Sequence, residues 1–283
     1  MGNDIRGRSM SYQNLVDSLS VNINVKDVCE NFYENVRRNL PDKIYKYYSL
    51  NENIELNNSK IHCLQDRKVY VSSRKEFNDP YDDFGYIYDS SSIVTFAENL
   101  GIQWILSDIY SDFKSICCFT KSGNDNFAMW AHYANNHQGY CVEYDLKKNF
   151  ELCSLVLPVE YVDKKMDLTE MITGRLKFVK NNKDVKLLED ALEFCAIFMS
   201  CVKHKTWSYE EEIRLLCPKN LPGMPYFDAI PNKIFIGSQC GEDNTNSLIQ
   251  IGNSLNIEVY KMNVVKEKIE YELDSELVSN TNV

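Results

Sequence analysis

The sequence predicts an α+β protein, with a mostly antiparallel core of short strands and flanking helices. Short runs of β-branched and aromatic residues recur along the chain, and helical patterns separate them without strict βαβ alternation. A length of 283 residues with 44% hydrophobic residues is sufficient for a large core. We expect an N-terminal extension over residues 1–40, one α+β domain over residues 41–265, and a loose tail over residues 266–283.

Composition and charge argue against several classes of protein. With a net charge of −10, the chain lacks the overall positive potential of a protein that coats nucleic acid. The ten cysteines are scattered without a CxxC pair, and the polar N-terminus has no signal-peptide pattern, so we expect reducing cytoplasm. The longest apolar run, residues 191–202, is too short to cross about 30 Å of hydrocarbon, so we expect no membrane contact.

The first third of the domain begins after an amphipathic helix. Apolar residues at helical spacing predict this helix over residues 25–40, with its apolar face packed within the chain or against a partner protein. Alternating patterns predict strands over residues 43–49 and 69–73. Residues 78–80 (Asn-Asp-Pro) have the chemistry of a turn, and both a structural and a functional role remain open for them.

The middle of the chain is expected to form helices over residues 93–113 and 127–134 and strands over residues 115–120 and 140–144. Asn124 or Asp125 can cap the second helix, and a turn over residues 135–139 follows it. In the second strand Glu143 faces away from Val142, so its carboxylate is either solvated or part of a site.

The last third again mixes strands and helices. Proline cannot donate to a neighbouring strand, so Pro158 indicates an edge strand over residues 155–162. The other expected elements are a helix over residues 184–203, strands over 209–216, 234–237 and 257–262, and a helix over 245–255.

The predicted strand over residues 209–216 carries the strongest candidate for a site. Its alternation places Glu210, Glu212 and Arg214 on one face. In one interpretation the arginine neutralises a surface pair of carboxylates, which contributes at most about 1 kcal/mol. In the other, the carboxylates line a cleft and an arginine fork orients them. The sequence does not distinguish the two.

Several other kinds of site are not indicated. The histidines and cysteines fall in no metal-ligand spacing, so no metal is expected. The chain has no GxxxxGKS/T, GxGxxG or GxSxG segment, which argues against a P-loop, a Rossmann site and a serine hydrolase. No local signature selects a nucleophilic cysteine. The remaining aromatic, hydroxyl, basic and acidic residues suit a flat cationic or aromatic ligand.

An ordered set of motifs resembles an uncharacterised bacterial family of unknown function. The motifs are KY at residues 46–47, FNDP at 77–80, MWxHYA at 129–134, GxCxEYD at 139–145 and WxYExExR at 207–214, before an isoleucine-rich strand that ends at Gly237. The resemblance covers residues 43–237 and departs at Tyr48, where the family often has a basic residue. Its members often lie near phage-resistance and mobile-element genes, which implies a defence or toxin effector.

The layout of that family is similar to ADP-ribosyltransferase-like folds, in which residues of three strands surround NAD. There, an early strand carries a basic or histidine residue, another carries a hydroxyl or aromatic residue, and a late strand carries a glutamate. By this resemblance Lys46 or Tyr47 takes the first role, Tyr70 and Ser72 the second, and Glu210 or Glu212 the third. The further NAD-binding candidates are Asn78, Trp130, His132, Tyr133 and Trp207.

The residues and the resemblance together predict an enzyme that consumes NAD, either an ADP-ribosyltransferase or a glycohydrolase. Glu212 is the first candidate for the key carboxylate, Glu210 the second, and Glu143 a supporting one; the acceptor is a protein or a nucleic acid. One alternative is a non-catalytic module that binds a nucleotide, a nucleic acid or a protein, with any nucleic-acid contact at the basic run 175–186. The other is a metal-dependent nuclease that uses Asp79, Asp82, Asp83 and the late glutamates.

Overall fold

The fold is built on a large, mostly antiparallel sheet. The computed structural model describes residues 11–21, 24–73, 77, 79–82, 85–101, 115–182, 200–217 and 225–279. Over these residues the largest sheet has nine strands in the order β15-β14-β13-β6-β1-β5-β11-β7, with β3 paired to β5. The strands are β1 (Lys43–Tyr48), β3 (Ser72–Ser73), β5 (Ser115–Thr120), β6 (Tyr140–Asp145), β7 (Val156–Pro158), β11 (Glu212–Cys217), β13 (Lys233–Ile236), β14 (Glu258–Val265) and β15 (Glu272–Leu277). The predicted α+β class is confirmed.

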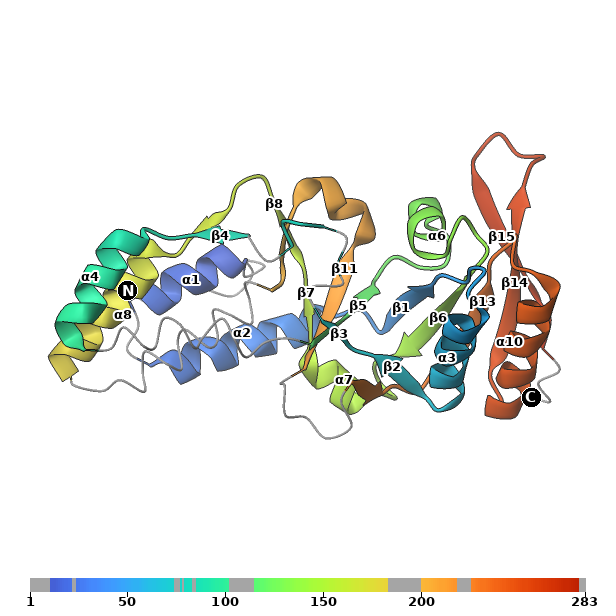
Figure 1. Cartoon of the computed structure of the whole chain (residues 1–283), viewed down its shortest axis with the longest axis horizontal. Helices are drawn as coiled ribbons and strands as arrows, with labels where there is room; N and C mark the ends of the chain where they lie inside the picture. The colour runs from blue at the N-terminus through green and yellow to red at the C-terminus, as the bar shows by residue number, and fades with distance from the viewer. Residues whose placement is uncertain are drawn as a thin grey trace.

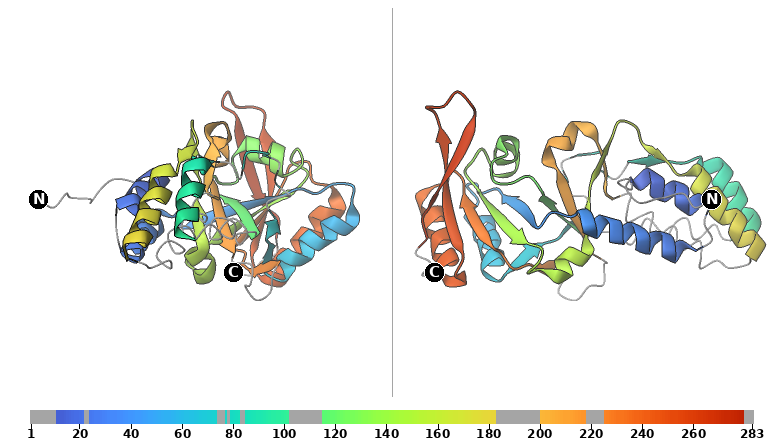
Figure 2. Two further views of the ribbon diagram at one scale, coloured as in Figure 1. Left: turned by 60° about the vertical axis from the view of Figure 1, so that its left-hand side comes forward. Right: turned by 180° about the vertical axis from the view of Figure 1, so that it is seen from behind.

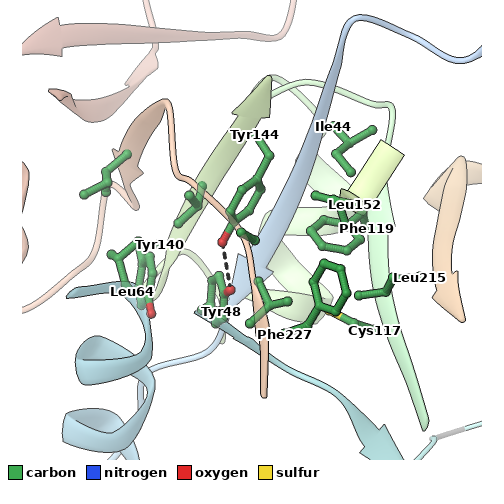
Figure 3. Packing of buried hydrophobic residues seen from close by; sticks show 14 of the residues in the cluster. Ile44, Tyr48, Leu64, Cys117, Phe119, Tyr140, Tyr144, Leu152, Leu215 and Phe227 are labelled. Atoms are coloured by element: carbon green, nitrogen blue, oxygen red, sulfur yellow. Dashed lines mark hydrogen bonds between the residues drawn. The ribbon is translucent and has the colours of Figure 1, made fainter. Parts of the chain in front are cut away.

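One face of the sheet packs on helices α3 (Ile54–Gln65), α7 (Phe150–Leu155) and α10 (Glu242–Leu255). Tyr140 and Tyr144 of β6 are fully buried there, because alternate residues of a strand point to the same face. Figure 3 shows Tyr144 and Tyr48 pointing toward each other, with their hydroxyl oxygens 3.2 Å apart. This face of the sheet is therefore covered by helices, and its apolar core contains the hydrogen bond between Tyr48 and Tyr144.

The opposite face of the sheet packs on helix α6 (Phe127–Tyr133). Asn126 caps α6 by accepting a hydrogen bond from the backbone N–H of Met129, rather than Asn124 or Asp125 as predicted. Trp130 is fully buried edge-on against Tyr47 of β1. The two faces of the sheet therefore have separate cores.

The turn between α6 and β6 depends on Gly139. A Cβ atom at this position would lie 1.9 Å from the carbonyl oxygen of Tyr48, so the backbones approach too closely for any side chain. Three residues of the same turn, Asn135, Asn136 and His137, all have left-handed φ values between 47° and 66°. The glycine in the predicted turn is thus required because the turn lies directly against the backbone of β1 at Tyr48.

A helical lobe extends from one end of the sheet (Figures 1 and 2). It combines α1 (Tyr12–Val21) and α2 (Val25–Asn39) with α4 (Ser90–Leu100) and α8 (Thr169–Asn182), and its core continues onto Ile116, Leu157 and Leu216 of the sheet. Helices α1 and α2 of the expected N-terminal extension thus share a core with α4, α8 and one end of the sheet. The apolar face of α2 is buried against this chain's own helices.

Three small sheets complete the described structure. They pair β2 (Lys68–Tyr70) with β12 (Tyr226–Asp228), β4 (Tyr86–Ile87) with β9 (Met166–Asp167), and β8 (Glu160–Val162) with β10 (Val202–His204). No helix in the described ranges has the length and apolar character needed to cross a membrane.

Several predicted elements differ from the observed ones. The tail expected to be loose contains β15, which pairs with β14 along six residues (Figure 1). The expected strand 155–162 is divided into β7, at the edge of the large sheet, and β8. Helix α4 ends at Gly101, whose φ of 69° suits a glycine cap. Residues 102–114 and 183–199, which complete two predicted helices, lie outside the described residues.

Candidate active site

A cavity of about 250 Å³ lies on the α6 side of the sheet, where β1, β5 and β11 are neighbours. Its lining combines aromatic, acidic and basic side chains from segments far apart in the sequence. The lining residues are Tyr45, Lys46, Tyr47, Ser72, Phe77, Asp82, Cys118, Phe119, Thr120, Met129, Tyr133, Lys203, Glu210 and Glu212. We call this cavity the first pocket.

Glu210 and Glu212 reach the first pocket by a local structure that differs from the predicted strand. Residues Lys205–Glu210 form a 3₁₀ helix, η3, and β11 begins only at Glu212. Glu211 joins them with a left-handed φ of 44°, and its side chain turns outward to pair with Lys121 at 3.1 Å. A single left-handed residue thus directs the carboxylates on both sides of it into the pocket.

Arg214 organises the acidic side of the pocket from a fully buried position. Its guanidinium bonds both oxygens of Asp82, at 2.5 and 2.7 Å, and both oxygens of Glu212, at 2.8 and 3.0 Å. A planar guanidinium suits such paired contacts, which fix the orientation of a carboxylate. The arrangement agrees with the interpretation of Arg214 as a fork and excludes a solvated surface ladder.

Lys203 is the second buried cation of the site. Its ammonium lies 2.6 Å from Glu210, 3.5 Å from Glu212 and 3.8 Å from Asp82. Burial alone would lower the pKa of Lys203, but Glu212 and Glu210 outweigh burial and raise it. Lys203 is therefore protonated at neutral pH and joins the three carboxylates in one network.

The two glutamates have opposite protonation tendencies. Burial would raise the pKa of Glu212, but the charges of Arg214 and Lys203 outweigh it and lower the pKa to about 2. Burial raises the pKa of Glu210, and the opposing effects of Lys203 and Tyr133 do not cancel it. Glu212 is thus a permanent anion near neutral pH, while Glu210 is the better proton acceptor of the two.

Aromatic rings form much of the remaining wall. Tyr45 and Tyr47 come from β1, and Tyr133 comes from α6 and hydrogen-bonds through its hydroxyl to Glu210. Phe77 lies over the Arg214 guanidinium, with 5.5 Å between the ring centre and Cζ. Burial raises the pKa of the Cys118 thiol, so this cysteine is not an activated nucleophile.

Lys46 lines the pocket but does not offer its ammonium to it. Nζ donates to the carbonyl oxygen of Cys118 at 3.2 Å and lies over the rings of Tyr48 and Phe119, which belong to the core on the other face. The ammonium therefore links β1 to the backbone of β5. Lys46 was expected to be the basic residue that binds NAD, and in the structure its ammonium makes a structural contact with the Cys118 carbonyl oxygen.

Three predicted binding residues lie away from the first pocket. Tyr70 packs edge-on against Tyr226 in the small β2–β12 sheet. Trp130 is a core residue whose Nε1 donates to the carbonyl oxygen of Asn124 at 2.7 Å. His132 is exposed and lies beside Tyr209. None of these three lines the pocket, and the residues of α6 that do are Met129 and Tyr133.

The two remaining candidates for binding NAD are Trp207 and Asn78, and Glu143 is the supporting candidate. Trp207 and Glu143 are not among the residues that line the first pocket. Trp207 lines a neighbouring cavity, with the Lys203 ammonium 4.7 Å from its ring centre. Asn78 lies outside the described residues. Glu143 bonds Lys43, Tyr45 and Asn232 beside the pocket and so stabilises the sheet. Of the predicted set, the pocket lining includes Lys46, Tyr47, Ser72, Tyr133, Glu210 and Glu212.

Lys203 and Asp82 are essential to the network, yet the sequence did not identify Lys203. The residue falls at the end of a predicted helix, whereas β10 carries it beside Tyr161 of β8. Asp82 was considered only as a metal ligand. In the part of the chain that the structure describes, no group of three His, Cys, Asp or Glu side chains is arranged to hold a metal ion.

The fold and the pocket together define an α+β protein with a buried network of carboxylates, Lys203 and Arg214 beside an aromatic wall. A family model described as a protein of unknown function (DUF2971) matches residues 129–215, from α6 to β11. The match agrees with the expected resemblance to a family of unknown function, and the matched segment carries Tyr133, Lys203 and both glutamates. No curated protein and no solved structure matches the chain significantly.

Proposed function

We propose that the chain is an NAD-consuming enzyme, an ADP-ribosyltransferase or NAD glycohydrolase, with its reaction centre in the first pocket. The observation that carries this proposal is an ionised glutamate, Glu212, held by Arg214 at the wall of an aromatic pocket. Residues of β1 and β5 line the pocket beside Glu212 of β11. This arrangement of three strands is similar to the one expected from ADP-ribosyltransferase-like folds. The hydroxyl on the middle strand is Thr120 of β5, and Ser72 of β3 lies beside it in the lining.

The charge of the pocket supports a cationic ligand. Three carboxylates, Asp82, Glu210 and Glu212, face two cations, Lys203 and Arg214, while the Lys46 ammonium bonds the carbonyl oxygen of Cys118 instead of these carboxylates. With all five groups ionised, this network has one excess negative charge. Aromatic walls and a negative field attract a flat positive ring, and the nicotinamide ring of NAD is one.

The reaction places separate demands on the two glutamates. Cleavage breaks the bond between ribose C1′ and the nicotinamide nitrogen, and the bonding electrons leave with neutral nicotinamide. Positive charge then develops on the ribose, where the fixed anion of Glu212 stabilises it. Water or an acceptor group bonds to C1′ and loses its proton to Glu210, whose raised pKa suits a base.

A non-catalytic module is the main alternative, and it would use the same cavity only for binding. The nuclease alternative has less support, because Asp82 and Glu212 already share Arg214 and are not open to a metal ion. Asp83 lies outside the described residues.

The negative charge of the network allows a direct binding test. We expect NAD, whose nicotinamide is cationic, to bind about tenfold or more tightly than NADH, whose ring is neutral, because a charge close to Glu212 is worth this much at a partly buried site. Calorimetry with both ligands measures the ratio. Glu212→Gln should abolish the preference, whereas Glu211→Gln, which changes the outward-facing neighbour, should retain it.

Nicotinamide release, followed by chromatography, separates the enzyme from the binding module. The proposal requires release by the wild-type protein and by Glu211→Gln, with a large loss in Glu212→Gln. Binding with the same charge preference but no release would support the module instead. Equal affinities for NAD and NADH would contradict the expected charge preference, which supports both the enzyme and a module that binds NAD.

A further inference from the structure

A second cavity adjoins the first pocket and shares Lys203 with it. Its volume is about 400 Å³, and it lies between the residues after β8, strand β10 and η3. The lining residues are Asp79, Tyr81, Gly85, Val162, Asp163, Lys164, Lys165, Val202, Lys203, His204, Thr206 and Trp207. We call this cavity the second pocket.

The first pocket alone is too small for a dinucleotide. Small-molecule sites usually have about 300–1,000 Å³, and the first pocket, with about 250 Å³, is below this range. The three carboxylates in its wall also oppose a pyrophosphate. A ligand with a cationic ring at one end and phosphates in the middle must therefore extend out of it toward positive charge.

The second pocket offers aromatic surface and, beside the carboxylates of Asp79 and Asp163, the positive charge of lysines. Lys164 and Lys165 are exposed at its rim. Asp163 beside them is neutralised by Lys205 at 2.5 Å. Trp207 forms part of the wall, and the side chain of Tyr81, 67% exposed, lies near the Lys165 ammonium. Lysines attract phosphate, and aromatic rings stack on nucleotide bases.

We propose that the second pocket binds the adenosine phosphate end of the dinucleotide whose nicotinamide end occupies the first pocket. The base stacks on Trp207, and Lys164 and Lys165 attract the phosphates. Lys203 lies between the two ends as a shared wall, since its ammonium is already bonded to carboxylates. The assignment of the nicotinamide end to the first pocket rests on the proposed function. The binding of adenosine phosphate in the second pocket does not.

Adenosine monophosphate (AMP) is the probe that tests the second pocket without any turnover. We expect calorimetry to show that AMP binds the full-length chain and that NAD displaces it. Trp207→Ala should weaken AMP binding at least about fivefold, the lower end of the effect of losing one base–aromatic stack. The double variant Lys164→Gln/Lys165→Gln should weaken it as well. Lys26→Gln, an exposed lysine on α2, is the matched control and should bind AMP as the wild type does.

The outcomes separate this inference from the proposed function. If Trp207→Ala fails to fold, the rim double variant still decides, because its side chains are exposed. AMP binding that is lost in the rim variant but persists in Glu212→Gln supports the second pocket, even if the wild type never releases nicotinamide. No AMP binding, unchanged AMP binding in the rim variant, or AMP binding that NAD does not displace would overturn the inference, whether or not NAD is consumed.

Discussion

The ammonium of Lys203 lies 2.6 Å from Oε2 of Glu210, and both side chains are buried. The contact links β10 to η3 and places a positive charge between the two glutamates of the pocket. Because buried charges are costly without partners, the pocket and the fold around it depend on the same contact.

Removing the Lys203 charge should therefore destabilise the fold strongly. Lys203→Met leaves Glu210 without its ion pair, and breaking a buried pair in this way costs about 3–5 kcal/mol. Chemical denaturation measures the loss in the free energy of unfolding. The control is Lys205→Met, whose exposed pair with Asp163 should contribute no more than about 1 kcal/mol. Equal effects of the two changes would contradict the role given to Lys203.

Acid should destabilise the protein through Glu212. Its pKa is lowered from 4.5 to about 2 in the folded protein, so its contribution is fully present above the unfolded-state value and is lost as pH falls toward 2. The shift corresponds to about 3 kcal/mol. Unfolding free energies measured from pH 6 to pH 2 should show this loss in the wild type and a shallower slope in Glu212→Gln. Parallel slopes would show that Glu212 is not held in this way.

Tyr133 should tune the proton affinity of Glu210. Its hydroxyl hydrogen-bonds to the carboxylate and opposes the rise in pKa caused by burial. Tyr133→Phe should therefore raise the pKa of Glu210 further, as measured by carboxyl ¹³C NMR titration. Tyr45→Phe is the matched control, because the Tyr45 hydroxyl bonds Glu143 instead. A Glu210 pKa that falls or stays the same in Tyr133→Phe would contradict the assignment.

Gly139 should not tolerate a side chain. In Gly139→Ala the new Cβ would lie 1.9 Å from the Tyr48 carbonyl oxygen, so β1 and the turn must separate. We expect a loss of about 3 kcal/mol or more, at the upper end of the cost of overpacking. Gly241→Ala, where nothing lies within 4 Å of the new Cβ, should cost about 1 kcal/mol or less. Thermal or chemical unfolding compares the two.

Local patterns predicted much of the sheet, because each strand carries its own alternation. Strand β6 has Tyr140, Val142 and Tyr144 on the face that packs on α3, α7 and α10 and Glu143 on the other, and this alternation was expected. The edge position of β7 likewise follows from the chemistry of Pro158. The pairing of β15 with β14 was not predicted, because a charged segment such as ELDSEL becomes a strand only through a neighbour.

Part of the site could also be predicted from the local alternation of a strand. Glu210, Glu212 and Arg214 lie close together in the sequence, so their shared face could be expected even though Glu211 interrupts the strand. Lys203 and Asp82 join them only through the tertiary fold, since Asp82 is 132 residues from its partner Arg214. Trp130 was expected to bind the ligand because its motif does not reveal that the ring points into the core.

The rate of nicotinamide release from NAD tests the central claim most directly. The comparison is kcat/KM for the wild type, Glu212→Gln and Glu211→Gln, with folding verified for each. Since a preorganised charge at the reacting centre commonly contributes about 10²–10³ in rate, we expect Glu212→Gln to lose at least about 100-fold. Glu211→Gln should stay within about twofold of the wild type, because its carboxylate is outside the pocket and its exposed ion pair is weak. No release by the wild type, or equal rates in all three proteins, would contradict the account.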